Sequence, residues 1–126
     1  MVQTDISQLS AECQEWRQIL RNYREEFHLC KKSLEEICRK SLSKDQLREV
    51  EHFDNQFHIQ LINIHDIKQF IKAHDRKIEI ESSSGETVSE ETYIEHEELL
   101  EQFLRLENTF QELRNEFKNF TSAASC

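Results

Sequence analysis

The first third of the chain repeats apolar residues with a regular seven-residue period. Within each period the apolar positions lie three and four residues apart, which places them on one stripe of an α-helix. The stripe consists of Ile6, Leu9, Cys13, Trp16, Leu20, Tyr23, Phe27, Cys30, Leu34 and Ile37. This pattern predicts a helix over about residues 5–42, with Cys30 buried in its core row.

Two further apolar stripes predict two further helices. The last third of the chain alternates two rows at the same spacing, Phe103, Phe110 and Phe117 with Leu99, Leu106, Leu113 and Phe120. They predict a helix over about 88–120, and continuing the phenylalanine row towards the N-terminus reaches His96. A broader stripe predicts a helix over about 44–80 and consists of Leu47, Val50, Phe53, Phe57, Leu61, Ile64, Ile67, Ile71 and Ile78.

Short polar segments mark the breaks between these helices. "SKDQ" at residues 43–46 and "TVSE" at residues 87–90 both match the capping box, in which a hydroxyl and a Glu or Gln side chain satisfy the first turn. "ESSSGE" at residues 81–86 has the composition of a loop, and it holds the only glycine of a chain without proline. Residues 121–126, "TSAASC", are expected to form a tail.

Because each helix alone would leave its stripe in water, the three stripes are expected to form one core. The first connection is so short that its helices must run antiparallel. We therefore predict an all-α fold: a single domain over residues 1–126, an elongated up-down-up three-helix antiparallel bundle with coiled-coil-like packing. The alternative, a two-helix hairpin with a detached third helix, is less favoured because a connection of about six residues suits folding back.

The charge distribution narrows the range of partners. The net charge is −9, and residues 86–101 hold seven glutamates without a lysine or arginine. Such a surface repels phosphate groups, so nucleic acid and anionic membranes are not expected as partners. The run is explained as a solvated helix face, or alternatively as a surface for cations or a basic partner. Because no apolar stretch reaches about 20 residues and the N-terminus lacks a signal-like pattern, a cytoplasmic location is expected.

The usual signatures of catalysis are missing. The four cysteines form no C-x-x-C pair, and their spacing does not indicate a disulfide framework. A chain with one glycine can hardly build a glycine-rich phosphate-binding loop, and long helices offer few loops to carry an active site. We therefore predict that the protein is not an enzyme.

One set of residues could nevertheless hold a metal ion. Counting outward from the predicted turn between the second and third helices brings His74 within one helical turn of His96, and the first helix presents Cys13 at that height. A thiolate and two imidazoles are suitable zinc ligands, with Glu12 or a water as a fourth. In the alternative interpretation, Cys13 packs as a small apolar residue and His96 bonds a neighbouring group.

A second candidate site lies on the outer side of the middle helix, in the stretch "FHIQLINIH" (residues 57–65). At about 100° per residue, Ile59, Ile62 and Phe70 point away from the core stripe, with His58 and His65 at its border. These three residues predict an interface with a protein partner or with a second copy of the chain. The alternative is that Ile62 contacts a neighbouring helix of the same bundle.

"QEWRQILRNYREEF" and "VEHFDNQF" together resemble a family of short helical bacterial proteins of about this length. The likeness covers the first helix and half of the second, and it departs after NQF, where family members carry charged residues and this chain reads "HIQLINIH". It implies a bacterial cytoplasmic protein, and it supplies no activity. The architecture with Trp16 also looks like a spectrin-type repeat. We predict a non-enzymatic interaction or structural module that self-associates; the alternative is a small metal-binding protein using Cys13, His74 and His96.

Overall fold

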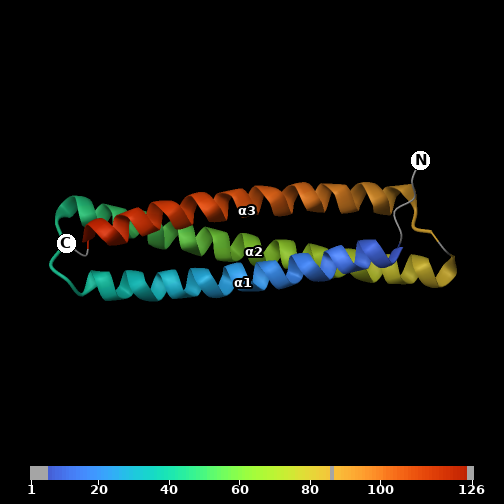
Figure 1. Ribbon diagram of the computed structural model, residues 1–126, viewed down its shortest axis with the longest axis horizontal. Coiled ribbons are helices and arrows are strands. Elements are labelled where there is room, and N and C mark those ends of the chain that lie inside the picture. Colours follow the sequence, from blue (N-terminus) through green and yellow to red (C-terminus); the bar gives the residue numbers. More distant parts are fainter. Residues whose placement is uncertain (1–5, 86, 125–126) are drawn as a thin grey trace.

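Three long helices lie side by side and antiparallel in the computed structural model of the protein, which describes residues 6–85 and 87–124 (Figure 1). Helix α1 spans Ile6–Cys38, α2 spans Lys44–Ser84 and α3 spans Glu90–Ala124. The chain runs along the bundle three times, so the predicted all-α, up-down-up three-helix bundle is confirmed. At about 1.5 Å per residue the longest helix, α2, reaches about 60 Å.

The core consists of the predicted stripes. All seven apolar residues of the α3 stripe are buried, as are most of those predicted for α1 and α2. Removing a large apolar side chain of this kind from water contributes roughly 1.5–3 kcal/mol. The prediction was wrong for Leu47, which is 48% exposed, and Cys30 is only half-buried. Gln60 was not predicted to be in the core but is buried there, and it accepts a hydrogen bond from the Asn63 amide at 3.5 Å.

The two ends of the core differ in chemistry. The end near the α1–α2 connection is filled by aromatic rings that touch one another across all three helices: Phe27, Phe53, Phe57, Phe110, Phe117 and Phe120. The end near the α2–α3 connection buries polar side chains, among them His74, Thr92 and His96, next to the ring of Trp16. The polar residues of the core are therefore concentrated at one end.

In the first connection, the start of α2 agrees with the prediction, but the end of α1 does not. Ser43 caps α2 as expected: its hydroxyl accepts from the Gln46 backbone, and the Gln46 side chain accepts from the Ser43 backbone. Helix α1 was expected to continue to about residue 42 but ends at Cys38. The cap explains the difference, because Ser43 needs an extended backbone and the chain must leave the helix before it.

The second connection lies later in the chain than predicted. Helix α2 continues to Ser84 rather than to about residue 80, because Ser82 and Ser83 donate their hydroxyls to the carbonyls of Glu79 and Ile80 and so fit a helix. The predicted capping box beginning at Thr87 was wrong. Ser89 caps α3 instead, since its hydroxyl accepts from the Thr92 backbone at 3.2 Å.

At its far end α3 continues through most of the segment that was predicted to be a tail, as far as Ala124. The predicted start of the first helix at residue 5, and the last two residues of the predicted tail including Cys126, lie outside the described residues. Among the helices that the structure describes, none is long and apolar enough to cross a membrane.

Candidate metal centre

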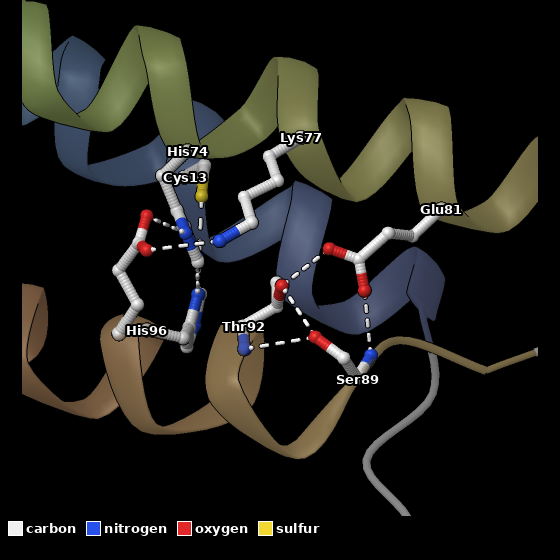
Figure 2. Close-up of polar contacts among 8 residues, drawn as sticks. Cys13, His74, Lys77, Glu81, Ser89, Thr92 and His96 are labelled. Carbon is white, nitrogen blue, oxygen red and sulfur yellow. Dashed lines mark hydrogen bonds and ion pairs between the residues drawn. The ribbon is translucent and has the colours of Figure 1, made fainter.

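One polar side chain from each helix meets at the end of the bundle near the α2–α3 connection. Cys13 comes from α1, His74 from α2 and His96 from α3, and Figure 2 shows the three side chains converging between the helices. Their exposures are 0%, 1% and 4%. The stripes explain this placement: Cys13 and His96 occupy core rows of their helices, and His74 lies between the buried residues Ile71 and Ile78 of α2.

The two imidazoles face each other, and each contacts a carboxylate through its outer nitrogen. Nε2 of His74 lies 2.9 Å from Nδ1 of His96, and the Cys13 sulfur lies 4.0 Å from the same Nδ1. The outer nitrogen of each ring meets a carboxylate: His74 Nδ1 lies 3.0 Å from Glu95, and His96 Nε2 lies 2.8 Å from Glu12. Lys77 donates to the other oxygen of Glu95 at 3.3 Å.

Glu95, His74, His96 and Glu12 form a row of hydrogen-bonding groups, and the number of protons in the row determines what can lie between the two rings. A carboxylate accepts hydrogen bonds, so each outer ring nitrogen must carry a proton to donate. If both imidazoles are neutral, each carries only that one proton, and the two facing nitrogens, 2.9 Å apart, then present lone pairs to each other. Two such lone pairs repel each other unless a cation lies between them, and that cation is either a proton or a metal ion.

The electrostatic surroundings disfavour the proton. Burial lowers the pKa of His74 below its ordinary value, although the hydrogen bond to Glu95 acts in the opposite direction. Burial raises the pKa of Glu95, but the hydrogen bonds from His74 and Lys77 outweigh it and leave that pKa below its usual range. The hydrogen bonds therefore favour the ionised, accepting form of Glu95, while the burial of His74 disfavours its doubly protonated form.

Cys13 is a protonated thiol while no cation is bound. Burial raises its pKa to about 12, and the negative charges of Asp75 and Glu12 act in the same direction. A thiol of this kind is a poor nucleophile, because the thiolate is the reactive form. A metal ion bound here would displace the proton and hold the sulfur as thiolate.

The three candidate ligand atoms fit a small tetrahedral ion. They lie within 4.8 Å of one another. A zinc ion with bonds of about 2.0–2.1 Å to nitrogen and about 2.3 Å to sulfur sets its ligand atoms roughly 3.4–3.7 Å apart in a tetrahedron. The two nitrogens would move apart, and the sulfur would approach Nδ1 of His96, each by about half an ångström. Glu12, named from the sequence as a fourth ligand, bonds the outer side of His96 instead, so of the two fourth ligands expected from the sequence only a water would be left for a bound ion.

The carboxylates complete a pattern typical of metal sites in proteins. A histidine that binds a metal through one nitrogen usually donates its other N–H to a carboxylate, a carbonyl or a water, which fixes the ring and makes it a better ligand. Both histidines have such a carboxylate here. Trp16 covers the site, its ring centroid 4.7 Å from that of His96, and Phe103 lies against the other end of Trp16 at 5.9 Å.

A separate polar group ties α2 to the start of α3 next to this site, as Figure 2 shows. Glu81 accepts from the Ser89 backbone at 2.6 Å and from the hydroxyl of Thr92. These bonds, the one from Thr92 first, hold the pKa of Glu81 below its usual range. The group fixes the N-terminus of α3 and thereby the height at which His96 enters the core.

The residues predicted as an interface are all exposed, and two of them line different grooves. Ile59, Ile62 and Phe70 are 38%, 48% and 57% exposed. Ile62 lines a groove between α1 and α2, whereas Phe70 lines a groove between α2 and α3. The outward direction predicted for all three is correct, but Ile62 and Phe70 lie on different sides of α2.

The contacts of Glu95 and Lys77 at this site, and that of Glu12 with the outer nitrogen of His96, were not predicted from the sequence. Glu95 could have been predicted, because it directly precedes His96 in the sequence and so lies beside the core row of α3. No family model, no curated protein and no solved structure matches the chain. The resemblance to short helical bacterial proteins accordingly stays a prediction.

Proposed function

We propose that this protein is a small non-enzymatic metal-binding bundle that holds one zinc-like divalent ion with Cys13, His74 and His96. One observation carries the proposal: the two facing imidazole nitrogens lie 2.9 Å apart beside a buried sulfur, while each outer nitrogen lies within 3.0 Å of a carboxylate oxygen. One sulfur and two imidazoles suit zinc among the common divalent ions, whereas magnesium and calcium prefer oxygen ligands.

The ion would act as a cross-link between helices. Its three ligands come from three different helices, so binding joins α1, α2 and α3 at the end of the bundle near the α2–α3 connection. Because the ligands are brought together only by folding, the binding free energy adds to the stability of the folded chain. In this proposal metal availability controls how firmly that end of the bundle is held.

The test measures zinc stoichiometry by native mass spectrometry, after a chelator has been dialysed away and zinc has been returned at a buffered concentration. We expect one zinc per chain in the natural sequence and none in His74→Gln, which keeps the size and polarity of the side chain. His65→Gln is the matched control, because His65 is an exposed histidine of the same helix. No bound zinc in the natural sequence, or equal loss in both variants, would overturn the proposal.

A second candidate function is favoured by a different observation. Large apolar side chains on the outer side of α2 remain exposed, Ile62 by 48% and Phe70 by 57%. Each of these side chains would be removed from water if a partner covered it, which favours association. We therefore retain self-association as a second candidate, independent of the metal ion.

A further inference from the structure

The groove between α1 and α2 gathers positive charge on an acidic chain. Its cavity volume is about 530 Å³, and Arg24 of α1 and Lys68 of α2 line it together with Ile62. His28, His58 and His65 also line this groove. An apolar residue that is 48% exposed thus lies among cationic and imidazole side chains, whereas the whole chain has a net charge of −9.

The cations of this groove are not neutralised within the bundle. Arg17, Arg21 and Arg24 follow one another on α1 at helical spacing, with Lys68 across the groove. Every ion pair formed among residues 6–85 and 87–124 uses other side chains. Burial and then the charges of Arg24, Arg21 and Arg17 lower the pKa of Lys68. These like charges repel one another, so a carboxylate brought into the groove would relieve the repulsion.

The outer side of α3 offers the complementary chemistry. We call the exposed residues Ile94, Glu97, Glu98 and Glu101 the acidic face of α3. Ile94 is 49% exposed, and Leu104 continues the face with 50% exposure. From Ile94 to Leu104 the face is about 15 Å long at about 1.5 Å per residue. His58 and Lys68 are also ten residues apart, so the groove has the same length.

We propose that the groove between α1 and α2 binds the acidic face of α3 of a second copy of this chain. The pairing covers exposed apolar residues on both sides, Ile62 in the groove and Ile94 on the face, and it sets carboxylates against the unpaired cations. A nucleic acid or an anionic membrane would also present negative charge, but neither sets carboxylates and apolar side chains at helical spacing on one face, as the acidic face of α3 does. This inference names the surfaces for the second candidate function and rests on it.

The geometry of the bundle fixes the kind of assembly. In a three-helix bundle the groove between two helices faces away from the third, so the groove and the acidic face lie on opposite sides of each copy. A contact between two different surfaces is head-to-tail, and it repeats into an open chain unless the rotation closes a ring. The assembly is therefore expected to grow with concentration and to weaken with salt, which screens exposed charges beyond about 8 Å at 0.15 M.

The experiment measures mass by sedimentation velocity at low ionic strength with the full chain. The groove variant carries Arg24→Glu and Lys68→Glu, and the face variant carries Glu97→Lys and Glu101→Lys. Each variant alone is expected to stay at the monomer mass of 15.2 kDa. Mixed together they are expected to associate, because the face of the first and the groove of the second are both intact.

Three results would contradict the proposal, and they separate it from the second candidate function. If the natural sequence stays monomeric at every concentration, self-association and the named surfaces both fail. If the natural sequence associates and neither variant changes that, only the surfaces fail and another face mediates the contact. If both variants are monomeric and their mixture is too, complementarity between the groove and the face fails.

A charge-matched control excludes an effect of net charge alone. Arg39→Glu with Arg48→Glu changes the net charge as much as the groove variant does, at exposed positions near the α1–α2 connection. This control is expected to associate like the natural sequence, and its failure to do so would contradict the role given to the groove. Circular dichroism on every variant checks that the helices remain.

Discussion

Replacing Cys13 by serine is expected to remove most of the stabilisation that zinc gives to the fold. The change keeps the size of a side chain that is 0% exposed, and the serine hydroxyl can bond Nδ1 of His96, so the metal-free protein should change little. What is lost is the sulfur ligand. Removing a group that only hydrogen-bonds to a metal ligand lowers metal affinity about 10–100-fold. Removing the ligand itself should therefore lower it by at least about 100-fold.

The size of the effect follows from linkage. An ion that binds only the folded chain stabilises it by about 4 kcal/mol when its free concentration is about a thousand times Kd. With an unfolding entropy of about 2.1 cal/mol/K per residue, this stabilisation raises the Tm of a chain of this length by about 15 °C. After a hundredfold loss of affinity the same zinc concentration gives about 1.4 kcal/mol, a rise of about 5 °C.

The assay is thermal unfolding followed by circular dichroism, with and without zinc at a fixed free concentration. Cys30→Ser is the matched control, because Cys30 lies on the same helix, is half-buried and has no place among the candidate ligands. It is expected to keep the full zinc-dependent rise. An equal rise in the natural sequence and in Cys13→Ser would refute the reasoning, as would an equal loss in the two serine variants.

Three further predictions test other parts of the structure. Replacing Glu12 or Glu95 by glutamine should weaken zinc binding about 10–100-fold in calorimetric titration while leaving one site per chain, and unchanged affinity would argue against the carboxylate support. Phe57→Ala, at a 0% exposed position in the aromatic cluster, should lower the free energy of unfolding by about 3–5 kcal/mol in urea titration; a loss below 1 kcal/mol would contradict the packing. Glu81 has a folded pKa below its ordinary 4.5, so its contribution to stability is complete above that pH and is lost as pH falls through the folded pKa. Glu81→Gln should therefore lose less stability than the natural sequence when urea titrations are compared from about pH 5 down to about pH 3, and parallel curves would contradict the bonds from Thr92.

The helices and the core could be predicted because apolar spacing determines which side of a helix is buried. The ends of helices were less predictable, because they depend on which hydroxyl bonds which backbone group. The serines after Glu81 illustrate this: their composition predicted a loop, but their hydroxyls bond carbonyls of the preceding turn and α2 continues. His74 was predicted to lie within one helical turn of His96, and their facing ring nitrogens lie 2.9 Å apart.

The meeting of Cys13, His74 and His96 could be predicted by counting from a turn, since their heights along the bundle depend only on residue numbers. The support from Glu12 and Glu95 could not, because it depends on which way each side chain turns beside the core. The separation of Ile62 from Phe70 had another cause. Their angles around α2 were predictable, but the sequence does not reveal on which side of α2 the other two helices pack.

The central claim, a metal ion held by one sulfur and two imidazoles, is tested most directly by titrating the chelator-treated protein with cobalt(II) and recording its absorption spectrum. Tetrahedral cobalt absorbs visible light strongly, and a cobalt–thiolate bond adds a charge-transfer band in the near ultraviolet. The account predicts both features, saturating at one ion per chain, with the charge-transfer band absent in Cys13→Ser. A weak spectrum like that of hydrated cobalt, or a charge-transfer band that persists in Cys13→Ser, would contradict it.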